Sequence, residues 1–162
     1  MRAHTKEYFE QFMSQLKETN ATLGFYCDFE KINYNVETIS IKLNQLNYLI
    51  GQNDIDAAIR RLWNENKGVF NVLEILIAVR TSDRKKAIMA DGNVKLINTL
   101  FDSVEGVIEY IHGTGLDNVF RNKQIKNLVD YVFGVETGLD TNARKNRSGH
   151  LMENQVASIL DN

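Results

Sequence analysis

Proline is absent from all 162 residues of this chain. Proline is the strongest helix breaker, because it lacks a backbone N–H and its ring clashes with the preceding turn of a helix. A chain without proline has no such stops, and its helices end instead at glycines and clusters of polar residues. The missing residue therefore predicts a mainly α-helical fold.

Length and composition fit a folded domain rather than a disordered chain. Hydrophobic residues make up 43% of the sequence, which is enough for a sizeable core, and the formal net charge is only −2. A charge this close to zero argues against a protein coated in cations for indiscriminate nucleic-acid binding, but it leaves room for a local basic patch. The single cysteine, Cys27, excludes an internal disulfide and fits a reducing cytoplasm.

Helical periodicity is clearest between residues 35 and 66. Apolar residues at alternating steps of three and four indicate one amphipathic helix, which Asn35 should cap and Gly51 should end. A second helix should open at Asp54 or Asn53. The apolar faces comprise Val36, Ile39, Leu43, Leu46 and Ile50 in the first helix, and Ile55, Ala58, Ile59 and Leu62 in the second.

The remaining apolar stretches extend the helical pattern. The run GVFNVLEILIAVR (residues 68–80) predicts a buried helix, because it is too short for a bilayer, which takes roughly 20 apolar residues. Asn93 should cap a helix that contains Leu96, and a later apolar stripe should end at Gly134. The run LGFYCDFEKINYN (residues 23–35) fits a loop or a short strand. Short connections between successive helices predict a compact multi-helix domain over residues 1–133.

An N-terminal helix face completes this pattern. Its apolar residues are Tyr8, Phe9, Phe12, Met13 and Leu16.

A basic segment near the C-terminal end, GLDTNARKNRSG (residues 138–149), differs from the rest. Three cations fall within four positions among small and amide residues, so we expect a flexible loop bracketed by glycines. Arginine and lysine suit phosphates and guanine edges, and asparagine can hydrogen-bond adenine. The alternative is a solvated surface loop without a partner. The predicted DNA-binding residues are Asn142, Arg144, Lys145, Asn146, Arg147 and Ser148.

A last helix should follow, from Gly149 to about Leu160, with Ser148 as its cap. Glu153 would lie at the edge of its apolar face. Its carboxylate is either a functional group or one of the many helix glutamates that only face solvent. No metal site is predicted from the histidines, which lack paired ligand spacing.

The stretch KNLVDYVFGVETGLDTNARKNRSGHLMENQV (residues 126–156) resembles the DpnII/MboI family of type II restriction endonucleases. This resemblance implies cleavage of double-stranded DNA at GATC by a homodimer in the bacterial cytoplasm, with no membrane partner. It implies a helical N-terminal part followed by an α/β nuclease core of the PD-(D/E)xK type, which uses Mg²⁺. Residues 134–162 would be the basic loop and first helix of that core.

Within this resemblance, Glu153 in LMENQV matches a helix-borne catalytic glutamate that precedes the first strand of the core. The metal-binding Asp and the Glu-x-Lys/Asn element of the family would follow after Asn162. We therefore expect the N-terminal part of a longer endonuclease, or a truncated copy of one, which should not cleave DNA alone.

Two other functions stay open. The chain could be a non-catalytic helical module for DNA binding or dimerisation. It could also be a plain helical protein whose basic segment matches by coincidence.

Overall fold

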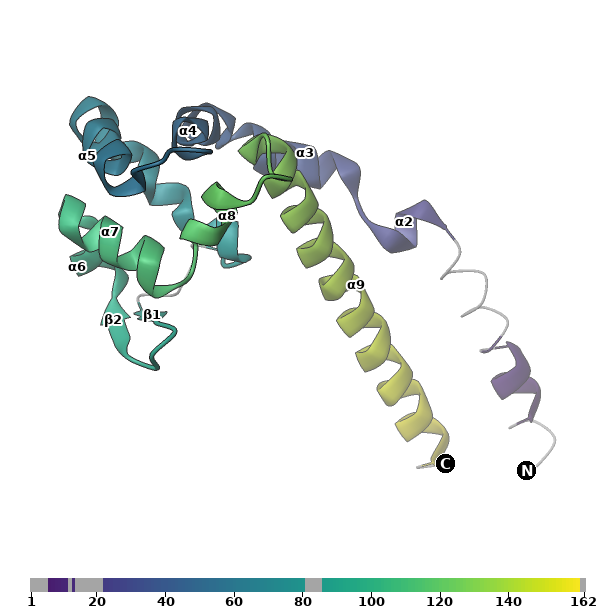
Figure 1. The fold of residues 1–162 in the computed structure, drawn as a ribbon. Coiled ribbons are helices and arrows are strands. Elements are labelled where there is room, and N and C mark those ends of the chain that lie inside the picture. The colour runs from purple at the N-terminus through teal and green to yellow at the C-terminus, as the bar shows by residue number, and fades with distance from the viewer. Residues whose placement is uncertain (1–5, 12, 14–21, 81–85, 161–162) are drawn as a thin grey trace. The chain divides into compact units, whose positions relative to one another are not determined.

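Helices make up most of the regular structure in the computed structural model, which describes residues 6–11, 13, 22–80 and 86–160 (Figure 1). The prediction of a mainly α-helical fold is confirmed. The chain forms two compact units, which we call the terminal unit (residues 1–32 and 136–162) and the central unit (residues 33–135). None of the helices in the described ranges is apolar over a stretch long enough to span a bilayer.

The elements follow one another with short connections. Residues 6–11 and 13 are helical and include Tyr8, Phe9 and Met13, whereas Phe12 and Leu16 lie outside the described residues. The further elements are α2 (Leu23–Tyr26), α3 (Phe29–Glu37), α4 (Ser40–Leu46), η1 (Asn47–Leu49), α5 (Ile55–Asn66), η2 (Lys67–Ile77), β1 (Lys86–Ile88), β2 (Val94–Leu96), α6 (Ile97–Phe101), α7 (Val104–Gly113), α8 (Asp117–Arg121) and α9 (Leu128–Leu160).

Helix α5 forms as its sequence predicts. The side chain of Asp54 caps it by accepting a hydrogen bond of 3.0 Å from the backbone N–H of Ala57. The apolar face predicted for this helix is buried, which confirms that face (Ile55, Ala58, Ile59, Leu62). The next stretch, η2, is the predicted buried helix, although it winds as a tighter 3₁₀ helix.

The helix predicted between Asn35 and Gly51 is instead divided into three pieces. Asn35 lies inside α3 and is not a cap. Residues 23–35 form no strand; they comprise α2, a two-residue connection and most of α3. The side chain of Thr22 caps α2, and the carboxylate of Asp28 accepts the Lys31 N–H at the start of α3. The prediction of a loop or strand overlooked that these two polar side chains can start helices.

A hairpin replaces the start of the helix predicted at Asn93. Strands β1 and β2 pair antiparallel, with Lys86 opposite Leu96. Asn93 lies in the turn between them, where its backbone N–H donates to the carboxylate of Asp91 at 2.9 Å. Gly92 has a φ of 85°, a left-handed conformation that glycine adopts without strain. Helix α6 therefore begins only at Ile97.

The central unit has an apolar core in which aromatic rings are the largest members. Phe70, Tyr110 and Phe120 are fully buried, and the rings of Phe101 and Tyr110 meet edge to face at 5.0 Å. Burial raises the pKa of the Tyr110 hydroxyl, and the nearby charge of Glu74 raises it further. Such a hydroxyl stays protonated in any ordinary buffer.

Helices α6 and α7 approach closely at Gly106, where a β-carbon would overlap the carbonyl oxygen of Leu100. We predict that Gly106→Ala lowers the free energy of unfolding by about 3 kcal/mol, because backbone rather than a flexible side chain blocks the added methyl group. Gly134→Ala is the matched control. It lies within helix α9 with open space around it, so it should stabilise by about 0.5–1 kcal/mol. Urea unfolding measures the free energy of unfolding of both variants. Equal changes would contradict the close approach of α6 and α7 at Gly106.

Candidate nucleic-acid interface

The basic segment is helical, and the prediction of a flexible loop over residues 138–149 is wrong. Helix α9 runs without interruption from Leu128 to Leu160, so Ser148 lies within this helix and does not cap a new one. Glycine weakens a helix by about 1 kcal/mol relative to alanine but, unlike proline, keeps its backbone N–H. The glycines that suggested a loop are therefore tolerated within α9.

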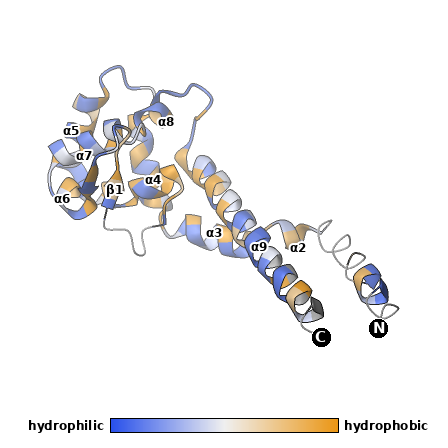
Figure 2. Cartoon of the chain, turned by 90° about the horizontal axis from the view of Figure 1, so that it is seen from below, coloured by the Kyte–Doolittle hydropathy of each residue, from blue (hydrophilic) through white to orange (hydrophobic). Residues whose placement is uncertain are grey.

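The buried side of α9 changes from apolar to charged along its length. Leu128, Val132, Glu136 and Asp140 are buried at steps of four residues, which places them along one side of the helix. Figure 2 shows α9 beginning in hydrophobic colours and continuing in mostly hydrophilic ones. The charged part of this side belongs to the terminal unit.

Asp140 is the centre of a polar cluster in the terminal unit. Its side chain is 2% exposed, and one carboxylate oxygen accepts hydrogen bonds from the backbone N–H of Asp28 at 2.8 Å and from Nε of Arg144 at 3.0 Å. Nζ of Lys31 lies 4.0 Å from the other oxygen. Burial alone would raise the pKa of Asp140, but these hydrogen bonds and the two cations hold it below its usual value.

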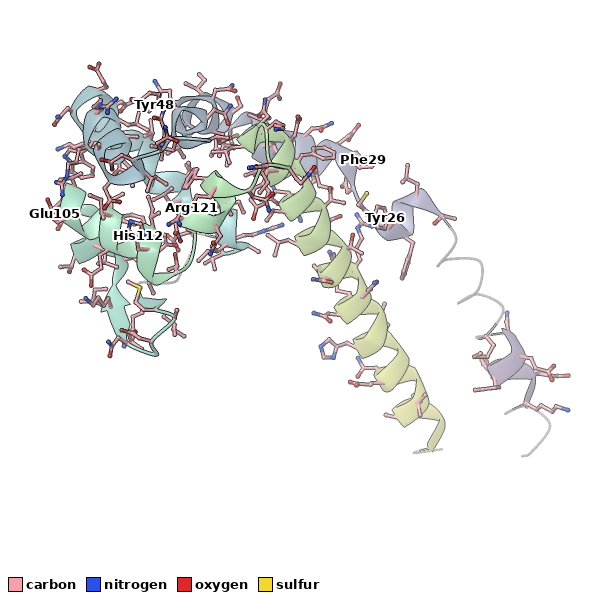
Figure 3. The ribbon with its side chains drawn as sticks, viewed as in Figure 1. Tyr26, Phe29, Tyr48, Glu105, His112 and Arg121 are labelled. Carbon is pink, nitrogen blue, oxygen red and sulfur yellow. The ribbon has the colours of Figure 1, made fainter. Side chains whose placement is uncertain are left out.

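Arg144 makes further contacts with α2 and with the connection between α2 and α3. A terminal nitrogen donates to the carbonyl oxygen of Gly24, and the other terminal nitrogen lies 4.0 Å from the carboxylate of Asp28. The hydroxyl of Thr141 lies 3.0 Å from the carbonyl oxygen of Tyr26, a residue labelled in Figure 3. Side chains of α9 therefore bind to a segment that lies more than a hundred residues earlier in the sequence.

The other predicted DNA-binding residues are spread around α9. Successive residues of a helix turn by about 100°, so Asn142 and Asn146 share one face, whereas Lys145 and Arg147 point in nearly opposite directions. All four are exposed, and Nε of Arg147 donates to the carbonyl oxygen of Ala143 on its own helix. Ser148 lies in the same helix. The structure therefore does not gather the six residues on one surface.

Glu153 lies far from the first turn of α9. Its side chain is 78% exposed, and one oxygen lies 3.5 Å from Nδ1 of His150. Across the part of the chain that the structure describes, no three His, Cys, Asp or Glu side chains are grouped so that they could hold a metal ion. The described residues therefore do not form a Mg²⁺ site around Glu153.

Sequence reasoning missed the partners of Asp140 and Arg144. The spacing of four residues between Asp140 and Arg144 is the ordinary spacing of a helical ion pair and could have been noticed once the segment was read as a helix. Asp28 and Lys31 gave no such signal, because they lie more than a hundred residues away in the sequence.

A second polar site lies in the central unit. A pocket of about 530 Å³ is lined by charged and amide side chains at the start of α5, together with His112 and Arg121, which are labelled in Figure 3. Nε2 of His112 lies 2.6 Å from a carboxylate oxygen of Asp56, and Arg121 pairs with Asp117. These side chains already have partners within the protein.

We predict that Asp140→Asn lowers the free energy of unfolding at pH 7 by about 1.5–3 kcal/mol, the range for hydrogen bonds to charged groups. The folded pKa of Asp140 is lowered, so its stabilisation is fully present above the unfolded pKa of about 3.9. The difference from the parent protein should therefore disappear as pH falls through the folded pKa. Glu65→Gln, at an exposed position of α5, is the control and should change stability by less than about 0.5 kcal/mol. A pH-independent difference would contradict the ionised cluster.

Comparison with known proteins shows the family of this chain. The family model described as DpnII restriction endonuclease matches residues 8–162. The type II restriction enzyme MboI of Moraxella bovis is 49% identical over 154 residues, which cover 95% of this chain and 55% of MboI. MjaIII of Methanocaldococcus jannaschii, also a type II restriction enzyme, is 43% identical over 162 residues, with the same shares covered.

A third relative is more distant. The type II restriction enzyme DpnII of Streptococcus pneumoniae is 36% identical over 159 residues, which cover 94% of this chain and 54% of DpnII. No solved structure matches the chain. The chain spans about half the length of these curated relatives. With a family model that matches nearly all its residues and relatives this similar, the chain belongs to the DpnII restriction endonuclease family.

Proposed function

We propose that the chain is the N-terminal part of a type II restriction endonuclease that cleaves double-stranded DNA at GATC. The observation that carries this proposal is the family match over residues 8–162. Relatives from three organisms are type II restriction enzymes, which supports the reaction class. The GATC site comes from the resemblance of residues 126–156 to the DpnII/MboI family.

We assign the DNA contact of this part to α9. An α-helix fits the major groove, where arginine or lysine reads guanine and asparagine reads adenine. Asn142 and Asn146 share one face of α9, and the cations Lys145 and Arg147 flank that face on either side. This arrangement suits a helix whose asparagines meet bases while its cations meet the phosphates of the two groove walls. Arg144 and Ser148, which the sequence also predicts for this site, lie in the same stretch of α9.

The domain arrangement and the cofactor follow from the same resemblance. We propose residues 1–133 as a helical domain and residues 134–162 as the start of a PD-(D/E)xK core, with Glu153 as its catalytic glutamate. Mg²⁺ would supply an activated water for attack on the phosphodiester. The described residues do not hold this ion, so we assign them no step of the cleavage.

A homodimer in the bacterial cytoplasm is the proposed working form. Two-fold symmetric proteins match palindromic sites, in which each subunit meets one half-site. GATC is such a palindrome.

We predict that the purified chain binds a GATC duplex with an affinity that falls steeply as salt rises. Each phosphate contact contributes about 0.9 to the slope of log K against log salt concentration. Replacing both exposed cations, as Lys145→Gln with Arg147→Gln, should therefore reduce the slope by about 1.8. Fluorescence anisotropy at several salt concentrations measures this change.

The matched control removes the same charge elsewhere, as Lys67→Gln with Lys123→Gln, two exposed positions of the central unit. This pair should leave the slope unchanged. Equal losses in both pairs would show general charge attraction instead of a contact along α9. Equal affinity for a duplex without GATC would favour the alternative of a non-catalytic DNA-binding module.

Cleavage is tested separately. We predict that the purified chain leaves a GATC duplex intact in magnesium buffer, because the resemblance implies that the metal-binding Asp and the Glu-x-Lys/Asn element of the family come later in the sequence than the segment that resembles it. Gel electrophoresis of end-labelled DNA measures this, and site-specific cutting would contradict the assignment of the catalytic residues to another part of the enzyme.

A further inference from the structure

We propose that Arg144 and Asp140 are positioning residues for DNA binding. In this assignment Arg144 does not contact DNA but fixes α9 to α2 and to the connection between α2 and α3, and so holds Lys145 and Arg147 in place for the phosphates. The inference rests on the proposed function, because it concerns the same helix and the same partner.

The guanidinium of Arg144 is already occupied within the protein. Its Nε donates to Asp140 at 3.0 Å, one terminal nitrogen donates to the carbonyl oxygen of Gly24, and the other faces the carboxylate of Asp28 at 4.0 Å. Arginine recognises a phosphate or a guanine through two parallel N–H groups. Nε and one terminal nitrogen of Arg144 already donate to internal acceptors, so a two-pronged contact that uses Nε would require the bond to Asp140 to break.

Breaking the bond between Arg144 and Asp140 would leave the buried carboxylate of Asp140 without its hydrogen-bonded cation. The Asp140 side chain is 2% exposed, and Arg144 is the cation that donates directly to it. A buried carboxylate that loses its cation is far more costly than a surface charge that does so. Transfer of Arg144 to a phosphate is therefore opposed by the charge that it would leave behind.

Among the side chains of α9 that the structure describes, Arg144 is also the last that is partly buried. Every later residue of this helix whose side chain the structure describes is exposed, from Lys145 to Ser158. A helix is a stiff element, so the direction of the exposed part is set where the buried part ends. Lys145 follows Arg144 directly and Arg147 lies within the next turn, so the Asp140–Arg144 pair fixes where these two cations point.

Three substitutions separate positioning from direct contact. Arg144→Lys keeps the charge but loses the planar fork that reaches Asp140 and Gly24 together. Arg144→Gln removes the positive charge of Arg144. Asp140→Asn removes the negative charge of its acceptor and leaves every lysine and arginine of the chain in place. We expect all three to weaken binding of a GATC duplex about five- to tenfold, the lower range of coupling between distinct sites, with the salt slope reduced by less than 0.5.

The double variant Arg144→Gln with Asp140→Asn should bind no more weakly than either single variant, because both changes remove one interaction. Lys145→Gln is the positive control for a phosphate contact and should reduce the slope by about 0.9. Arg60→Gln is the charge-matched control. It pairs with Glu105 in the central unit and should leave affinity unchanged.

Two results would overturn the inference. If Arg144→Lys binds like the parent while Arg144→Gln loses about 0.9 of slope, and Asp140→Asn has no effect, Arg144 contacts phosphate directly. If none of the three variants changes the affinity, the pair does not position the cations.

A structural readout separates this inference from the proposed function. The backbone N–H of Asp28 donates to Asp140, so its hydrogen exchange reports the attachment of α9 without any DNA. We expect faster exchange at Asp28 in Arg144→Lys and Arg144→Gln than in the parent chain. If the parent binds no DNA, the proposed function fails, and so does the positioning role. Unchanged exchange at Asp28 would show in addition that Arg144 does not hold the attachment.

Discussion

The terminal unit depends on one buried carboxylate, that of Asp140. A charged group with 2% of its side chain exposed must find donors inside the protein, because it has lost nearly all its water. Asp140 finds them in the backbone N–H of Asp28 and in Arg144, which belong to distant parts of the sequence. Among the described apolar residues of this unit, only Cys27 and Ile32 are buried. A polar cluster therefore holds the segments of this unit together, as an apolar core holds those of the central unit.

Because the basic segment is part of a helix and not a flexible loop, its cations can meet a partner only from fixed directions. A flexible loop would let its cations fold around a phosphate, at the cost of ordering them on binding. A helix instead presents its side chains at fixed angles before DNA arrives. With DNA as the proposed partner, a pre-ordered helix would confine the contact to the cations whose donors the protein has not already bound. Lys145 and Arg147 meet this condition better than Arg144, whose guanidinium is held by internal acceptors.

The sequence predicted much of the central unit, because local signals decide its elements. Asp54 caps α5 through its own side chain, and the apolar residues that follow are buried as their spacing indicates. The errors have local causes as well. Three glycines and many polar residues suggested a loop around Gly138 and Gly149, although none of them breaks a helix as proline does. The cluster at Asp140 could not be predicted, because Asp28 becomes its partner only through the fold. The family itself was recognisable from residues 126–156, and the match over residues 8–162 confirms it.

The continuity of α9 through residues 138–149 is the claim on which this account most depends, because both the anchor at Asp140 and the direction of the later cations follow from it. Backbone chemical shifts from NMR test it residue by residue in the purified chain. The account predicts helical Cα shifts without a break from Asp140 through Gly149. Random-coil shifts over these residues would show a loop and would contradict it.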